Sequence, residues 1–154
     1  MVYEIGALKP ALIAAYAADF VKLLDSKNNR LQWGAMTALN SIAAENPKAV
    51  YAALSKLALV AEKGSVITKD NYVSILIKLC AVKQYQEDAL ALLNEQFLIS
   101  LPNQLPMYAE NALGVIDAKH KAPFIKTLNS RLGDFEKETK RKRVEKVLRK
   151  LEGR

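Results

Sequence analysis

The stretch NRLQWGAMTALNSIAAE, residues 29–45, organises the rest of this 154-residue chain. Its apolar frame is Ala35, Ala38, Leu39 and Ile42, spaced by 3, 1 and 3 residues. That spacing places all four side chains on one stripe of an α-helix. The frame returns at intervals of 37, 37 and 35 residues as Tyr72, Ile75, Leu76 and Leu79; Ala109, Ala112, Leu113 and Ile116; and Val144, Val147, Leu148 and Leu151.

Apolar spacings of 3 and 4 continue through the chain, without the sustained alternation of a strand, so the sequence predicts an all-α fold. We expect about eight helices, at residues 10–26, 29–45, 47–63, 68–82, 85–99, 107–116, 122–132 and 139–152. Because the frame falls on every second helix, the helices pair into about four hairpins that share one core. The expected single domain, 1–154, then consists of four repeats, approximately 10–45, 47–83, 85–117 and 119–152.

Composition and charge narrow the class of protein. The single cysteine, Cys80, permits no intrachain disulfide, which fits a reducing compartment. No secretory leader is visible, and the uncharged run from Pro10 to Ala18 is too short to cross a bilayer. We therefore expect a cytoplasmic protein without membrane contact. Residues 119–154 carry thirteen Lys/Arg and five Asp/Glu, whereas residues 1–118 carry ten and eleven, so the net charge of +7 arises in the last quarter.

The first predicted helix is apolar on nearly every side. Between Ala11 and Leu24 its only charged residues are Asp19 and Lys22. Such a helix must be covered on most of its surface. There are two alternatives for covering this surface. Either the segment 1–9 folds back as a cap, or the remaining surface pairs with a second copy of the chain to form a homodimer.

The frame resembles the second helix of HEAT-type (armadillo-like) repeats, in which a small residue is followed by Ala-Leu and then by an aliphatic residue three positions on. Residues 35–42 match this pattern, and residues 109–116 match it more closely, including the glycine after leucine. Tyr72 and Ile75 depart from it, and of the positions near the helix starts where the family has arginine, only Arg141 agrees. The resemblance, which extends to small bacterial HEAT-like proteins, implies a right-handed α-α superhelix whose second helices line a concave face that binds partners.

The side of these helices opposite the core gives the leading hypothesis, a non-enzymatic scaffold that binds a protein or peptide. If the helices stack in register, mixed side chains form ladders across this face, with one apolar anchor at Trp33. The alternative is that Trp33 folds sideways onto Leu31 or onto a residue of the first helix. The predicted partner-binding residues are Trp33, Thr37, Asp70, Ser74, Met107 and Asn111.

A basic stripe in the last helix gives the alternative hypothesis, binding of nucleic acid or another polyanion. The stripe is Lys142, Arg143, Lys146, Arg149 and Lys150. A charged outer face is also what a terminal repeat needs for solubility. Few aromatic residues lie among these cations to stack on bases, which counts against nucleic acid.

No pattern in the sequence predicts a catalytic, cofactor or metal site. Some HEAT-like proteins are alkylpurine DNA glycosylases with Trp, Asp and Arg on a basic concave face, and Trp33, Asp70 and Arg149 are the comparable trio here. They lie in three different repeats, so we do not carry that activity over. His120 is the only histidine and has no paired Cys or carboxylate spacing, and Cys80 is expected to be a buried small hydrophobe.

Overall fold

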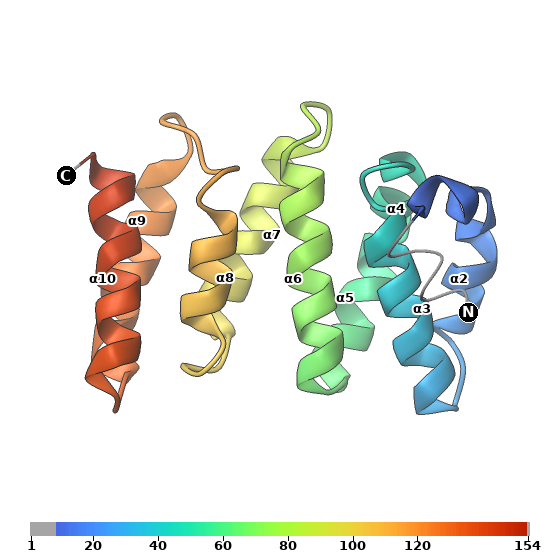
Figure 1. Cartoon of the computed structure of the whole chain (residues 1–154), viewed down its shortest axis with the longest axis horizontal. Helices are drawn as coiled ribbons and strands as arrows, with labels where there is room; N and C mark the ends of the chain where they lie inside the picture. The colour runs from blue at the N-terminus through green and yellow to red at the C-terminus, as the bar shows by residue number, and fades with distance from the viewer. Residues whose placement is uncertain (1–8, 154) are drawn as a thin grey trace. The chain divides into compact units, whose positions relative to one another are not determined.

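The computed structural model describes residues 9–153, and this part of the chain contains nine α-helices, three short 3-10 turns and no β-strand. The all-α prediction is therefore confirmed. The chain divides into two compact units, Met1–Tyr85 and Gln86–Arg154. Each unit has its own set of packed helices, drawn from blue to green and from yellow to red in Figure 1.

Unit 1 begins with the 3-10 turns η1 (Pro10–Leu12) and η2 (Ala14–Tyr16). Its helices are α2 (Ala17–Leu23), α3 (Asn29–Ile42), α4 (Pro47–Ala52), α5 (Leu54–Lys63) and α6 (Val66–Cys80). Helix α2 packs on α3, α5 packs on α6, and α3 packs beside α6. The two helices that carry the apolar frame, α3 and α6, are thus direct neighbours.

Polar caps set the helix starts in unit 1. The Asn28 side chain accepts hydrogen bonds from the backbone N–H of Arg30 (3.0 Å) and of Leu31 (3.4 Å) and so caps the start of α3. Asn46 accepts from the N–H of Ala49, and its own amide donates to the carbonyl of Ala14 at 3.1 Å. Asn46 therefore starts α4 and also ties it to the first turns of the chain.

Two helices differ from the sequence prediction. The segment 10–26 opens with 3-10 turns and is α-helical only in α2, because neither η1 nor η2 has a side-chain cap and tighter bonds such as Ile13 N–H to Pro10 O (3.1 Å) satisfy its backbone. The segment 47–63 is broken at Ala53, whose N–H bonds to Val50 O. Both pieces nevertheless bury one apolar stripe: Val50, Leu54, Leu57 and Ala61.

Unit 2 consists of two helical hairpins, one formed by α7 (Gln86–Ile99) and α8 (Leu105–Ala112) and the other by α9 (Lys121–Arg131) and α10 (Glu138–Glu152), with the 3-10 turn η3 (Leu132–Asp134) after α9. Helix α7 packs on α9 and α8 packs on α10. Figure 1 shows α8 and α10 side by side, in front of α7 and α9. The first helix of one hairpin therefore contacts the first helix of the other, and the two second helices likewise contact each other.

The repeated frame forms the core of both units, as predicted. Leu39 and Leu76 are 0% exposed in unit 1, and the frame residues of α10 are all buried. Leu113 is the exception, since it is only half-buried. The reason is local: α8 ends at Ala112, so Leu113 lies in the cap and the chain turns through the bond from Val115 N–H to Ala112 O.

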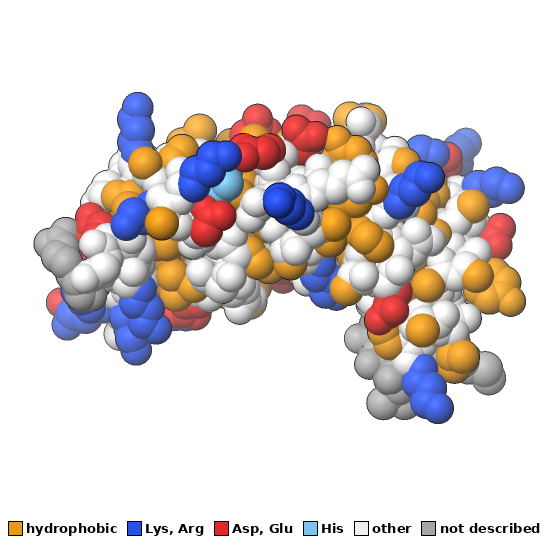
Figure 2. Space-filling view, turned by 90° about the horizontal axis from the view of Figure 1, so that it is seen from above, with side chains coloured by type: hydrophobic (Ala, Val, Ile, Leu, Met, Phe, Trp, Pro, Cys, Tyr) orange, Lys and Arg blue, Asp and Glu red, His pale blue; other side chains and the backbone are white. Residues whose placement is uncertain are grey.

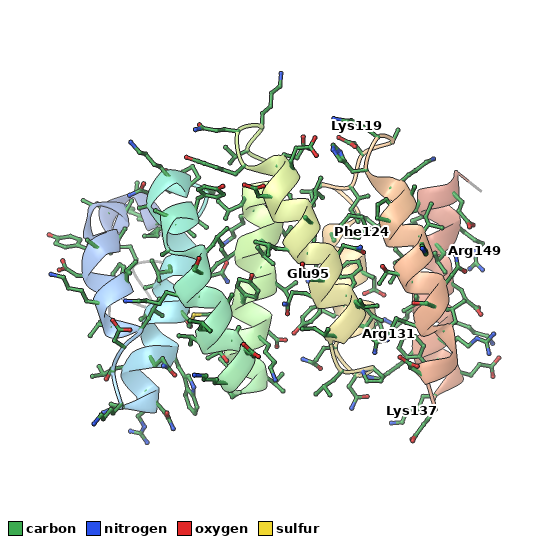
Figure 3. All side chains as sticks on the ribbon, turned by 180° about the vertical axis from the view of Figure 1, so that it is seen from behind. Glu95, Lys119, Phe124, Arg131, Lys137 and Arg149 are labelled. Atoms are coloured by element: carbon green, nitrogen blue, oxygen red, sulfur yellow. The ribbon has the colours of Figure 1, made fainter. Side chains whose placement is uncertain are left out.

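One buried cation, Arg131, joins the two hairpins of unit 2. Its side chain is 8% exposed, and its guanidinium donates to the carbonyls of Phe97 (2.7 Å), Leu98 (3.0 Å) and Ser100 (2.8 Å). Its Nε also bonds to Asp134. Figure 3 shows Arg131 reaching from the end of α9 toward the end of α7. The carbonyls that α7 leaves unpaired at its C-terminus are thereby satisfied.

Candidate binding surfaces

The predicted partner-binding residues of unit 1 are largely occupied within the unit. The Thr37 hydroxyl donates to the carbonyl of Trp33 at 3.0 Å and accepts from Asn71 Nδ2 at 3.4 Å. Asn71 Oδ1 in turn accepts from Asn40 Nδ2 at 3.0 Å. Thr37 thus belongs to a polar seam between α3 and α6, and Trp33 beside it is half-buried.

The other predicted residues of unit 1, Asp70 and Ser74, lie half-buried on α6. One turn beyond Ser74, Lys78 donates to the backbone carbonyl of Asn40 at 2.6 Å and so caps the end of α3. Burial lowers the pKa of Lys78. This face of unit 1 therefore serves helix packing more than it offers free binding groups.

The predicted residues of unit 2 are open to a partner. Met107 and Asn111 lie one turn apart on α8, and both are exposed, Met107 at 36%. Between them, Glu110 accepts two hydrogen bonds from the guanidinium of Arg143 on α10, at 2.7 and 2.8 Å. The Arg143 bonds hold the pKa of Glu110 below its ordinary value, and the charges of Lys146 and Lys150 act in the same direction.

The cations of α10 divide into paired and unpaired groups. Arg141 pairs with Glu145, Lys142 with Glu138 and Arg143 with Glu110. Lys146, Arg149 and Lys150 are exposed, and no carboxylate in residues 9–153 lies within ion-pair distance of them. Figure 3 shows Arg149 at the outer edge of unit 2.

Together these side chains define what we call the α8–α10 face. It consists of Met107, Glu110, Asn111, Arg143, Lys146 and Lys150. Its Glu110–Arg143 pair is internally neutral, so its net charge comes from the two unpaired lysines. The face presents one flexible apolar side chain, one amide and two free cations, which is a set suited to binding and not to bond-making chemistry.

His120, which sequence reasoning set aside, joins the loop before α9 to the start of α7. Its Nδ1 lies 2.6 Å from Asp117 Oδ1 and its Nε2 lies 3.0 Å from Glu87 Oε1, while Lys119 also contacts Glu87 at 3.0 Å. Ionised carboxylates only accept hydrogen bonds, so both contacts are hydrogen bonds when each ring nitrogen carries a proton. The Glu87 contact, and then Asp117, raise the pKa of His120, and the histidine in Figure 2 lies among acidic and basic side chains.

No group in the described residues stands out as a reactive centre. Cys80 is buried, and burial raises the pKa of its thiol to about 12, so it stays protonated. Residues 9–153 contain no cluster of three His, Cys, Asp or Glu side chains placed to hold a metal ion. Of the trio considered for glycosylase chemistry, Trp33 and Asp70 lie in unit 1 and Arg149 lies in unit 2.

The apolar first segment of unit 1 exposes three large side chains, Leu12, Tyr16 and Leu23. The cap expected from residues 1–9 lies outside the described residues except for Lys9. Within residues 9–153, no helix combines the length and the apolar character needed to cross a bilayer.

Sequence comparison identified no matching family model and no matching curated protein.

Proposed function

We propose that this protein is a non-enzymatic binding module that holds an acidic segment of a partner protein on the α8–α10 face. The observation that carries the proposal is the pattern of charge pairing on α10. Three cations are matched by carboxylates and Lys140 donates to the carbonyl of Asn103, whereas Lys146, Arg149 and Lys150 have no carboxylate within ion-pair distance in the described chain.

A solubility cap does not require this arrangement. Lys142 and Lys146, and Lys146 and Lys150, are like charges four residues apart on one helix, and each such pair destabilises a helix by roughly 0.2–0.5 kcal/mol. A glutamate at position 146 would be equally soluble and would attract both neighbours. The chain instead keeps a row of cations, and an acidic partner would offset the repulsion between them.

The face favours a protein partner over nucleic acid. The free cations from Lys146 to Lys150 span only about 6 Å of helix, at ~1.5 Å per residue. Helix α10 contains no aromatic side chain on which bases would stack. Methionine and arginine, here Met107 and Arg143, are residue types enriched at protein interfaces.

The scaffold belongs to the same proposal. Within each unit, second helices pack on second helices: α3 on α6 in unit 1 and α8 on α10 in unit 2. This neighbour pattern supports a HEAT-like solenoid of stacked hairpins. A cytoplasmic location is supported by the single protonated thiol of Cys80.

Position-specific photocrosslinking in the source cells tests the function. A photoreactive phenylalanine analogue replaces Asn111 on the face or, as a control, the exposed Asn129 on α9. We expect position 111 to capture a protein with an acidic segment, and this product to disappear in Lys146→Glu/Lys150→Glu. The matched charge control is Lys126→Glu/Lys137→Glu, which changes two exposed lysines of unit 2 outside the face; Figure 3 labels Lys137 at the link before α10.

Three results would overturn the proposal. The same products from positions 111 and 129 would show that the face is not selective. Equal loss in both charge-reversal variants would show that only net charge matters. Crosslinks to nucleic acid in place of protein would assign the face to the other class of partner.

A further inference from the structure

A hollow of about 520 Å³ lies in unit 2 where the end of α8, the start of α9 and the end of α10 meet. Its apolar lining is Leu113, Ile116 and Leu151, and its basic lining is Lys121 and Lys150. The volume falls within the range of about 300–1,000 Å³ that is usual for ligand sites. Figure 2 views the molecule from the end at which the loop between α8 and α9 lies.

The apolar floor exists because the repeat frame ends early in α8. Had α8 continued, Leu113 would occupy the buried rung that Leu39 and Leu76 occupy in unit 1. Instead it lies in the cap, half-buried, and lines the hollow together with the buried Ile116 and Leu151.

Two glycines, Gly114 and Gly153, lie at the edge of the hollow and have no side chain that would cover it. A Cβ added at Gly114 would meet no atom within 4 Å, so this side is open. Gly153 ends α10 with a φ of 77°, in the left-handed region that favours glycine. The half-buried Leu113, beside the open position at Gly114, is therefore the part of the floor that a partner's side chain meets first.

The charge of the hollow is positive. Lys121 and Lys150 have no carboxylate within ion-pair distance in the described residues. Asp117 also lines the hollow, but its Oδ1 is engaged by His120, both through Nδ1 at 2.6 Å and through the backbone N–H at 3.0 Å. With two lysines and one carboxylate in its lining, the hollow carries a net positive charge.

We propose that this hollow is the anchor site for the acidic partner and takes one aliphatic side chain with a carboxylate beside it. The aliphatic group contacts the floor formed by Leu113, Ile116 and Leu151, and the carboxylate lies between Lys121 and Lys150. The inference rests on the proposed function, since Lys150 belongs to both the hollow and the α8–α10 face. It adds a sequence requirement to the partner: acidity alone is not enough.

Two synthetic peptides test the requirement. Each has eight residues with blocked ends and only glutamate and aspartate around one central position, which is leucine in the first and serine in the second. Affinities are measured by methyl NMR titration of the full chain. We expect the leucine peptide to bind at least about tenfold more tightly and to shift the methyl signals of Leu113, Ile116 and Leu151. The methyl signals of Ile99, which is 69% exposed and outside the hollow, should not move.

Two variants separate the hollow from the face. Leu113→Asn removes part of the floor and should reduce the leucine preference to less than about threefold. Lys121→Glu, which leaves every residue of the α8–α10 face in place, should weaken both peptides by about tenfold or more. Unchanged methyl spectra away from the substitution show that each variant is folded.

The outcomes distinguish the two proposals. Equal binding of the two peptides, still abolished by Lys146→Glu/Lys150→Glu, would overturn the hollow and leave the proposed function standing. A leucine preference that survives this double variant at unchanged affinity would contradict both, because Lys150 belongs to the hollow as well as to the face. No binding of either peptide at millimolar concentration would overturn both.

Discussion

Arg131 offers the sharpest test of how unit 2 is held together. In Arg131→Met the aliphatic stem is kept and the guanidinium is lost, so the carbonyls of Phe97, Leu98 and Ser100 lose their donor. The Phe97 bond is buried, and an unsatisfied buried carbonyl costs roughly 1–3 kcal/mol. The bonds to Leu98 and Ser100 are part-buried, and water replaces part of each, so each contributes roughly 0.5–1 kcal/mol. The expected loss of unfolding free energy is about 2–5 kcal/mol.

The assay is urea unfolding followed by circular dichroism, together with the melting temperature. For a chain of this length, 1 kcal/mol corresponds to about 2–4 °C, so we expect Tm to fall by about 4–20 °C. Arg131→Lys keeps one positive charge and fewer donors, and should lie between the wild type and Arg131→Met.

The matched control is Arg141→Met, which breaks only the exposed i,i+4 pair with Glu145. This change should cost less than about 0.5 kcal/mol. If Arg131→Met cost no more than Arg141→Met, the guanidinium would not be the link between the hairpins, and the reasoning would be refuted.

Three further predictions concern the core, the histidine and the thiol. Leu76→Ala should cost roughly 2–5 kcal/mol in urea unfolding, whereas Leu113→Ala, at a half-buried position, should cost clearly less. His120 stabilises the fold fully below its ordinary pKa of 6.5, and this contribution is lost as pH rises through its raised folded value. Glu87 and Asp117 have lowered pKa values in the folded protein. They stabilise the fold fully above their ordinary pKa values of 4.5 and 3.8, and this stabilisation is lost as pH falls through the lowered values. The urea midpoint of the wild type relative to His120→Gln should therefore be highest between about pH 5 and 6.5. Cys80 should react with iodoacetamide at pH 8 only after unfolding, because it is buried and its pKa is raised to about 12.

Each of these predictions has a contradicting result. Equal costs at positions 76 and 113 would mean that the early end of α8 does not weaken the repeat. A pH-independent difference between the wild type and His120→Gln would mean that the ring is neutral in the folded protein. Rapid alkylation of native Cys80 would show that α6 opens readily.

Local patterns in the sequence predicted most of the helices. The 3-1-3 spacing placed Leu39 and Leu76 in the core, and Asn46 followed by a proline marked a real boundary. The break at Ala53 was missed because alanine carries no stop signal, and only the backbone bond to Val50 shows it.

The polar contacts that connect the helices were not predictable from one sequence. In the sequence, nothing distinguishes Arg131 from an exposed cation. Its partners are backbone carbonyls 31 to 34 residues earlier, and a backbone carbonyl cannot be recognised from residue type. Glu87 is 33 residues from His120, so nothing local suggests that they pair. The same holds for the basic stripe: sequence reasoning found its cations, but only the packing of α8 on α10 shows that Glu110 neutralises Arg143 and leaves Lys146 and Lys150 free.

The most direct measurement of the binding claim is the affinity of the captured partner for two variants of equal net charge. Lys146→Glu/Lys150→Glu reverses the α8–α10 face, and Lys126→Glu/Lys137→Glu reverses two lysines outside it. The account predicts that the first variant raises Kd by about a hundredfold or more, and that the second changes it by less than about threefold. Similar Kd values for the two variants would contradict it.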